Sequence, residues 1–283
     1  MEAPVSAIIP TWKRLDDLRA TLERIKKCDP APAEIIVHVD AGDTKTAAWL
    51  QSNHSDIRLL TSNTSKGPGG GRNRLLEEVE QPYAASFDDD SYPMDENYFA
   101  RLVQAFEEHP SSGVIAAVVS HRGEEISPPC SNAYQVSGFG GGGCGYRITA
   151  WEDVTGYVPL PLAYGMEEVD LAHQLLDRDW KIVRDERLRV FHDTDLSHHL
   201  DPDTTAAAIA NRALLAFLRY PARYAGLGLA QYVNRIVWSV QNGRVRGIAS
   251  GILKTPKLLW EHRKRREPVE VETVRKYRQL TAK

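Results

Sequence analysis

Hydrophobic and polar positions alternate in two different ways near the start of the chain. Residues 5–10 (VSAIIP) form a short, β-branched apolar run that Pro10 closes, a pattern that predicts a buried strand. Apolar residues then recur at spacings of three and four over residues 15–25, namely Leu15, Leu18, Leu22 and Ile25. This spacing predicts a helix with one apolar face.

The same succession of strand and helix repeats further along the chain. Apolar runs at residues 34–39, 57–61 and 84–87 predict three more strands, and the segments between them predict helices. Strands separated by helices indicate parallel neighbours with right-handed crossovers, so the sequence predicts an α/β fold with a doubly wound sheet. In such a sheet, ligands bind beyond the carboxyl ends of the strands.

Polar residues follow the carboxyl ends of three of these strands. Pro10 and Thr11 come after the first strand, Asp40 after the second, and the triplet Asp88–Asp90 after the fourth. We expect them to meet at one rim of the sheet, where clustered carboxylates suit Mg²⁺ or Mn²⁺. The alternative is that the triplet and Ser91 cap the helix predicted over residues 96–109.

The glycine-rich segment at residues 65–79 predicts a turn that leads into a helix. Its GPGGGR motif lacks the Gly-Lys-Ser/Thr ending of a phosphate-binding P-loop and the dinucleotide pattern GxGxxG. Glycines still let backbone amides approach a phosphate or a base, with Lys66 or Arg72 adding positive charge. A flexible turn with no ligand is the other interpretation.

Composition sets the class of protein. A chain of 283 residues with 42% hydrophobic residues can bury a sizeable core, which excludes disordered and fibrous proteins. The three cysteines are widely spaced, as expected for reduced thiols. No apolar run is long enough to span a membrane and the start of the chain is not typical of a signal peptide, so we expect a cytoplasmic protein.

Charge is unevenly distributed along the chain. Residues 203–283 contain 16 Lys and Arg against 5 Asp and Glu, a balance of +11, so residues 1–202 carry −14. Apolar positions in this basic region predict amphipathic helices that break at Pro221, Gly243 and Pro256. Such helices can dock at the inner face of an anionic membrane, pack on the acidic part of the chain, or form a homodimer contact. Without a recognised motif, nucleic acid binding is not expected.

Seven segments of the chain carry a family resemblance. They are SAIIPTWKR, EIIVHVDAGD, SKGPGGGRNRLL, SFDDDSYP, GCGYRITAWEDVTGY, YGMEEVDLAHQLLDRDWKI and VFHD. In order and spacing they resemble the family 2 glycosyltransferases, which are inverting enzymes with a GT-A fold, over residues 4–195. The resemblance implies a mixed, mainly parallel sheet flanked by helices, with a C-terminal helical appendage.

The resemblance also implies a division into domains. Residues 1–202 would form the GT-A catalytic domain, with a donor half at about residues 1–95 and an acceptor half at about 96–202. Residues 203–283 would form the basic helical region.

Residues that match the family's nucleotide-sugar-binding positions come from the donor half. Asp88 or Asp89 would face the ribose, Asp40 the base or ribose, and Arg72 the nucleotide. The resemblance makes Asp90 a metal ligand, with Asp88 as a second ligand and His192 completing the site. The nucleotide-sugar-binding set is Pro10, Thr11, Arg14, Asp40, Lys66, Arg72, Asp88 and Asp89.

According to the family resemblance, the acceptor half supplies the general base and the residues that bind the acceptor. Glu168 matches the general base, although many relatives have Asp at this position. Glu167, Asp170 and Tyr164 would bind the acceptor, with support of the site as the alternative for Asp170. Adjacent helical residues point about 100° apart, so only one of Glu167 and Glu168 can face a given reacting atom. For an isolated EEVD sequence, the start of a solvated helix would be the simpler interpretation.

The function implied is the transfer of a sugar from a nucleoside diphosphate sugar to a hydroxyl of a glycan, lipid-linked or small-molecule acceptor, with Mn²⁺ or Mg²⁺. One alternative is a GT-A scaffold that binds nucleotide sugar or glycan without catalysis. The other is a nucleotidyltransferase, which would need a basic glycine loop directly after the first strand. Residues 10–17 (PTWKRLDD) match such a loop poorly.

Overall fold

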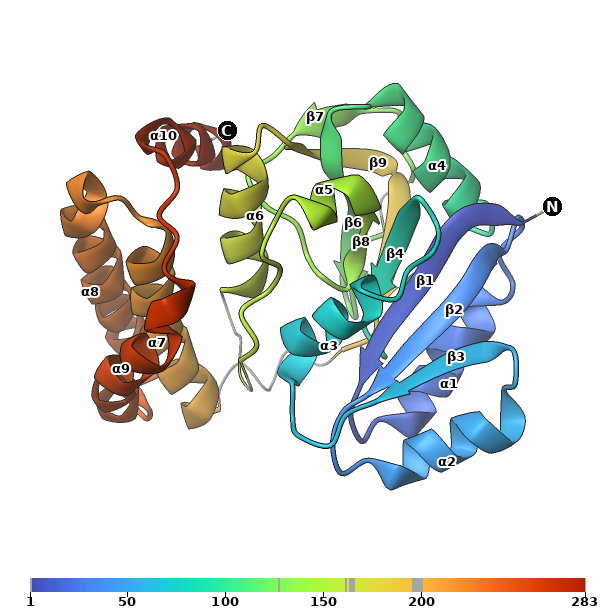
Figure 1. Ribbon diagram of the computed structural model, residues 1–283, viewed down its shortest axis with the longest axis horizontal. Coiled ribbons are helices and arrows are strands. Elements are labelled where there is room, and N and C mark those ends of the chain that lie inside the picture. The colour runs from blue at the N-terminus through green and yellow to red at the C-terminus, as the bar shows by residue number, and fades with distance from the viewer. Residues whose placement is uncertain (1, 127, 161, 163–165, 195–200, 283) are drawn as a thin grey trace.

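The computed structural model describes residues 2–126, 128–160, 162, 166–194 and 201–282. A mixed sheet of nine strands forms the centre of the protein, with helices on both of its faces (Figure 1). Helices from the end of the chain gather at one side of this α/β body. The predicted fold class, a mixed sheet flanked by helices with a C-terminal helical region, is confirmed.

Within the expected donor half, the four strands formed by residues 3–87 are parallel to one another. They run in the order β3 (Ile57–Thr61), β2 (Pro32–Val39), β1 (Ala3–Thr11) and β4 (Tyr83–Phe87). Each neighbouring pair is parallel, so all four carboxyl ends lie at one edge. The four strands predicted from apolar runs are therefore confirmed together with their direction.

The other half of the sheet is mixed. Strand β8 (Gly143–Arg147) lies antiparallel between β4 and β6 (Ser112–His121), and β9 (Lys181–His192) is parallel to β6. The short strands β5 (Ser91–Pro93) and β7 (Ala133–Gln135) pair antiparallel with β9. Parallel pairing therefore dominates only in the donor half.

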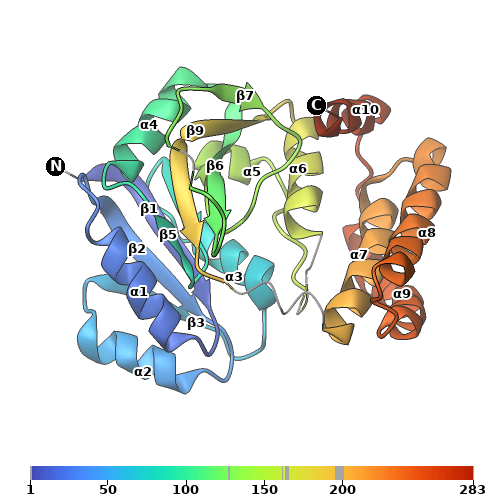
Figure 2. The same cartoon turned by 180° about the vertical axis from the view of Figure 1, so that it is seen from behind.

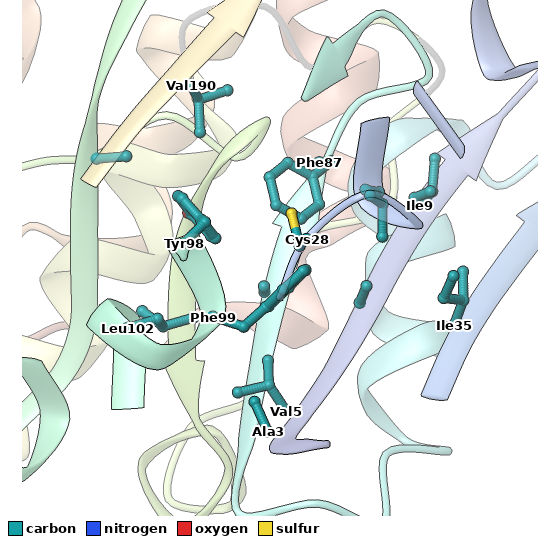
Figure 3. Close-up of a cluster of buried hydrophobic side chains, with 14 of the residues drawn as sticks. Ala3, Val5, Ile9, Cys28, Ile35, Phe87, Tyr98, Phe99, Leu102 and Val190 are labelled. Atoms are coloured by element: carbon teal, nitrogen blue, oxygen red, sulfur yellow. The ribbon is translucent and has the colours of Figure 1, made fainter. Parts of the chain in front are cut away.

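Each face of the sheet has its own hydrophobic core. One face is covered by helices α1 (Leu15–Ile25), α2 (Thr44–Asn53) and α4 (Tyr98–Glu108). Their buried side chains pack against the strands in a hydrophobic cluster, part of which is shown in Figure 3. Helices α3 (Gly67–Leu76), α5 (Ile148–Glu152) and α6 (Glu167–Asp177) cover the other. Ile9 faces the first core and Ile8 the second, which explains why β1 is a continuous apolar run.

The glycine-rich segment is helical, so the turn predicted there is wrong. Helix α3 begins at Gly67, with Pro68 in its first turn, and contains the glycines. A Cβ atom at Gly69 would lie 2.3 Å from Glu167 Oε1, and one at Gly71 would lie 2.9 Å from His38 Nδ1. Close packing of α3 therefore outweighs the low helix propensity of glycine.

Four helices follow the sheet. They are α7 (Pro202–Arg219), α8 (Ala225–Gln241), α9 (Ile248–His262) and α10 (Val271–Thr281). Pro221 and Gly243 lie directly after helices as predicted, but Pro256 lies inside α9. Packing of α9 against α7 at Gly251 holds the helix together there. Pro256 itself is exposed, so water can satisfy the carbonyl that loses its N–H partner.

The C-terminal helices pack on the α/β body (Figure 2). Leucines of α7 share a hydrophobic cluster with Val158, Leu160 and Met166, which precede or begin α6. Helix α10 returns to α6, where Tyr277 stacks on His173 with a ring-centroid distance of 4.2 Å. Within the described residues, no helix has the length and apolar character required to cross a bilayer.

Candidate active site

The residues predicted to meet at the rim of the sheet lie together in the structure. Thr11 at the end of β1 donates its hydroxyl to Asp89 Oδ2 at 2.8 Å. Arg14 pairs with Asp89 at 3.0 Å and with Asp90 at 2.7 Å, since α1 starts immediately after β1. One guanidinium thus contacts two of the three clustered carboxyl groups.

The acidic triplet does not cap a helix. Residues after Asp90 form β5, and α4 begins only at Tyr98 with Asn97 at its N-cap. The backbone N–H of Asp88 donates to Ser91 Oγ at 2.6 Å, which fixes the turn between β4 and β5. The capping alternative is therefore wrong, and the triplet lies at the end of β4 with its carboxylates directed into the rim.

Asp88, Asp90 and His192 form a candidate metal site. Each offers one ligand atom, and these atoms lie within 4.8 Å of one another. His192 ends β9 and pairs with Ser91, which places its Nε2 atom 3.0 Å from Asp90 Oδ1 and 4.0 Å from Asp88 Oδ2. Two carboxylates and an imidazole suit Mn²⁺ or Mg²⁺, so the residues present fit the expected cation.

Electrostatics at the triplet follow from this crowding. Burial opposes ionisation of Asp90, but His192 and Arg14 lower the pKa of Asp90 to about 2. Burial raises the pKa of Asp89 to about 7, against the pull of Arg14 and Thr11. Although burial opposes it, Asp90 and Asp88 raise the pKa of His192. His192 thus faces two carboxylates, and the shifts at Asp90 and His192 both arise from this close approach.

A cavity of about 450 Å³ opens on one side of this group, and we name it the donor cavity because the residues expected to bind a donor line it. Its lining includes the rim residues and extends to Ser65, Gly67, Pro68 and Thr194. Trp12 and His38, which were not among the expected site residues, also line it and lie close to predicted rim residues in the chain. Trp12 is 53% exposed, and its indole N–H donates to Ala41 O at 3.0 Å.

Asp40 holds the start of α3 against the end of β2. Its carboxylate accepts hydrogen bonds from the backbone N–H groups of Ala41, Lys66 and Gly67 and from the Ser65 hydroxyl. Burial opposes ionisation, but these donors lower the pKa of Asp40. Asp40 lines the donor cavity, whereas Lys66 contributes its backbone N–H to Asp40 and is absent from the described lining.

Arg72 lies beneath the site and joins its two halves. The side chain is buried in α3 and its guanidinium contacts Asp88, Ser86 Oγ at 3.2 Å, and Glu167 Oε2 at 4.0 Å. These acidic neighbours raise its pKa despite the opposing effect of burial. Arg72 therefore connects the candidate metal ligand Asp88 to the first turn of α6.

A second cavity, of about 760 Å³, lies on the other side of the metal group. Asp88, His192 and Pro68 line both cavities. Gly140–Gly143, at the start of β8, form part of the second cavity. A Cβ atom at Gly142 would lie 2.1 Å from Asp88 Oδ2, and one at Gly141 would lie 2.9 Å from Arg72. Gly141 and Gly142 thus form a closely packed part of the cavity wall.

The two glutamates at the start of α6 have different surroundings. Glu167 is 4% exposed and accepts the Gly69 N–H at 2.7 Å. Burial, with the charge of Glu168, raises the pKa of Glu167 to about 8, against Arg72 and Gly69. Glu168 is more exposed, lines the second cavity, and accepts the Gly141 N–H at 3.2 Å. Glu168 is therefore the glutamate with room for a substrate.

Two expected acceptor-binding residues differ from this pattern. Asp170 is fully buried, and Arg219 of α7 pairs with it at 2.7 Å while Gln174 donates to it at 2.8 Å. Its carboxylate faces α7, so the acceptor contact expected for Asp170 is wrong. Tyr164 lies outside the described residues. His121 and Arg184 line the second cavity but have no sequence motif that could have identified them.

A parallel half, a mixed second half and an Asp-Asp-His group at their junction are the features expected from the resemblance to GT-A glycosyltransferases. Residues 6–134 match the family described as "Glycosyl transferase family 2". This match confirms the family resemblance over those residues, and it ends before α6. No curated protein matches the chain.

Solved structures support the same fold. Staphylococcus aureus TarS 1–349 with UDP-GlcNAc is 17% identical, with 99% of this chain and 84% of that chain covered and a TM-score of 0.64. The mannosyltransferase PcManGT from Pyrobaculum calidifontis, solved with GDP-Man and Mn²⁺, is 12% identical (100% and 85% covered, TM-score 0.60).

GalNAc-T7 with UDP, GalNAc and Mn²⁺ is 12% identical, with 78% of this chain covered and a TM-score of 0.62. The match spans 49% of the GalNAc-T7 chain, about half of its length. At these identities, the similarity establishes the GT-A fold.

Proposed function

We propose that the protein is an inverting, metal-dependent glycosyltransferase that moves a sugar from a nucleoside diphosphate sugar to an acceptor hydroxyl. One observation carries the proposal: Asp88 and His192 line both cavities, while Glu168 lines only the second. A donor in the first cavity and an acceptor in the second would meet at the candidate metal group.

The first cavity is the proposed donor site. Neighbours with the same fold were solved with UDP, UDP-GlcNAc or GDP-Man, which supports a nucleoside diphosphate sugar as the class of donor. Pro10, Thr11 and Trp12 form one side of this cavity and can contact the base and ribose. Asp89 orients Thr11 and Arg14, so we assign it a supporting role at the nucleotide.

Asp88, Asp90 and His192 would hold the cation. When bound, Mn²⁺ or Mg²⁺ supplies positive charge that stabilises the diphosphate leaving group. Arg14 keeps Asp90 ionised, and Arg72 fixes Asp88 from below. These two arginines thus hold the carboxylates in place before any substrate arrives.

Glu168 is the proposed general base. Gly141 N–H binds its Oε1 atom, which orients the carboxylate toward the second cavity and leaves Oε2 to take the proton of an acceptor hydroxyl. Glu167 is buried against Gly69 and Arg72, so it supports α6 rather than contacting the proton. The hydroxyl would attack from the side opposite the diphosphate, and a single displacement inverts the anomeric configuration.

Donor binding and transfer can be tested separately. The melting temperature is measured with a panel of nucleoside diphosphates and their sugars, with and without Mn²⁺, and the best donor is then assayed with glycan and lipid-linked acceptors. We expect a metal-dependent shift for at least one donor. Glu168→Gln should keep this shift and lose transfer by about 100-fold or more, because only proton removal is affected.

The matched control is Glu77→Gln, which changes an exposed glutamate outside both cavities and should retain full transfer. If no nucleotide gives a metal-dependent shift, the donor site is wrong. Unchanged turnover in Glu168→Gln would remove it as the base. Donor binding without transfer to any acceptor by the unmodified protein would instead favour the non-catalytic scaffold.

A further inference from the structure

We propose that the outer faces of α8 and α9, with the turn between them, dock on an anionic membrane surface. Helix α8 lies at the edge of the protein farthest from the sheet (Figure 1). This docking face goes beyond sugar transfer, and it rests on the proposed function only for the identity of a membrane-resident acceptor.

Helix α8 presents an apolar stripe to solvent. Leu229, Val233, Val237 and Val240 are between 44% and 64% exposed. Their spacings of four, four and three residues place them on one side of the helix. The opposite side packs on α7, where a Cβ atom at Gly228 would lie 2.6 Å from Ala216 Cβ. The exposed stripe therefore has no partner among the described residues.

Helix α9 and the preceding turn continue this pattern. Leu253 is 79% exposed and Trp260 is 66% exposed, while Ile252 and Val245 are also exposed. Of the twelve large hydrophobic residues exposed in the described chain, eight lie between Leu229 and Trp260. Scattered exposed hydrophobics are normal, but this concentration on two helices marks an interaction surface.

The net positive charge of the same region indicates that its partner is anionic. Residues 204–260 contain no Asp or Glu, and Arg263–Arg266 follow at the end of α9. Arg263 lies over the Trp260 ring at 3.8 Å, so an aromatic side chain and a cation share the edge of the face. Apolar residues bordered by Arg, Lys and Trp are typical of helices that lie in the interface of an anionic bilayer.

A second copy of the chain fits this face less well. A symmetric dimer through α8 and α9 would bring two identical surfaces of net positive charge together, since Glu261 is the single acidic residue on these two helices. Anionic lipid headgroups offer the missing negative charge, while the acyl region accepts the apolar stripe. Charge complementarity therefore favours a lipid surface.

The docking face is connected to the second cavity. Gly247, between α8 and α9, has a φ angle of 95°, and a Cβ atom there would lie 2.1 Å from Pro202 O at the start of α7. Thr204, in the first turn of α7, lines the second cavity. The turn that carries Arg244, Val245 and Arg246 thus lies at the same end of α7 as the proposed acceptor site. A lipid-linked acceptor could reach Glu168 from there.

Sedimentation with lipid vesicles tests the proposal on the full chain. We expect binding to phosphatidylcholine vesicles that contain phosphatidylglycerol, weaker binding as salt is raised, and little binding to phosphatidylcholine alone. The double substitution Val233→Glu and Val237→Glu should weaken binding at least about tenfold, because it places charges in the apolar stripe. Both positions are exposed, so folding should be preserved.

Ile126→Glu is the matched control, since Ile126 and Val233 are both 48% exposed and Ile126 lies outside the face. It should bind vesicles like the unmodified protein. The metal-dependent nucleotide shift should be the same in all three proteins, which separates this test from the donor-binding test. Equal binding to neutral and anionic vesicles, or unchanged binding in the double variant, would overturn the proposal. A dimer in light scattering that the double variant dissociates would assign the face to a second copy.

Discussion

The two cavities that meet at Asp88 and His192 are built by different physical means. The proposed donor cavity is held by paired charges and hydrogen bonds, such as Arg14 with Asp89 and Asp90. The proposed acceptor cavity is bounded by backbone that comes very close to side chains, as at Gly141 and Gly142. Helix α6, which carries Glu168 at this cavity, is also held by α7 and α10, through the Arg219–Asp170 ion pair and the stacking of Tyr277 on His173.

This difference explains what each cavity can tolerate. Charge networks lose function when one member is removed, because the remaining charges stay buried without a partner. Closely packed glycines lose function when a single methyl group is added, because the neighbouring side chains must move. The following predictions test this contrast, from the largest expected effect to the smallest.

The largest effect should come from the charge network. Asp90→Asn keeps the shape of the side chain and removes one candidate metal ligand, so we expect metal-dependent donor binding and transfer to fall by about 1000-fold. The measurement is isothermal titration of the donor with and without Mn²⁺, followed by the transfer assay. Asp16→Asn changes a carboxylate that is 91% exposed and should behave like the unmodified protein. Full metal-dependent binding in Asp90→Asn would exclude the site.

The second prediction concerns the attachment of α6 to α7. Arg219→Met leaves Asp170 buried without its cation and should lower the free energy of unfolding by about 3–5 kcal/mol. Urea denaturation measures this change. Arg178→Met removes one partner of an exposed ion pair with Glu267 and should cost less than about 1 kcal/mol. Equal costs for the two substitutions would show that burial of the Asp170 pair has no special importance.

The glycine wall gives the third prediction. Gly142→Ala should displace the Asp88 carboxylate and lower the transfer rate by about 10-fold to 100-fold. The free energy of unfolding, measured without donor, should change little. Gly140→Ala is the control in the same loop, because a Cβ atom there would have no neighbour within 4 Å. Both are compared by their transfer rates over a Mn²⁺ titration. Normal metal dependence in Gly142→Ala would contradict the close-packing argument.

The smallest effect should be a pH dependence at Glu167. The pKa of Glu167 is raised to about 8, so the folded state binds a proton more tightly than the unfolded chain. Stability from this group is present below the unfolded pKa of about 4.5 and is lost as the pH rises through about 8. Glu167→Gln removes this loss, so its melting temperature relative to the unmodified protein should rise by about 2–5 °C between pH 5 and pH 9.

Differential scanning fluorimetry over this pH range provides the measurement. Glu77→Gln changes an exposed glutamate and should show a constant difference across the range. A constant difference for Glu167→Gln as well would mean that burial does not raise the pKa of Glu167.

The residues at the rim of the sheet could be predicted from the sequence, because the signals that define each strand lie within a few neighbouring residues. An apolar run defines a strand, and parallel strands bring their following residues together, so Thr11 and Asp89 meet although 78 positions separate them. The strands are identified by the spacing of apolar residues, and the polar residues of the rim by their positions directly after the strands. The donor half of the fold and most of its polar residues could therefore be predicted.

Contacts between distant side chains could not be predicted in this way. The family resemblance made Asp170 an expected acceptor-binding residue. In the structure its carboxylate is paired with Arg219, which lies on α7, 49 positions later in the chain. The glycines of α3 have low helix propensity, and only their contacts with Glu167 and His38 explain why they form a helix. Pro256 lies inside α9 for a similar reason, since tertiary packing overrides a local helix-breaking signal.

The change from acidic to basic composition near residue 202 is not a boundary in packing. Leu214 and Leu218 of α7 share a core with Val158, and Tyr277 of α10 stacks on His173 of α6. A truncated protein that ends at residue 202 would therefore lose part of its own core. Exchange of the C-terminal region between relatives would need to retain the inner faces of α7 and α10. Among the described residues, the outward sides of α8 and α9 make no contribution to this shared core, so substitutions there can change what the surface binds and leave the core intact.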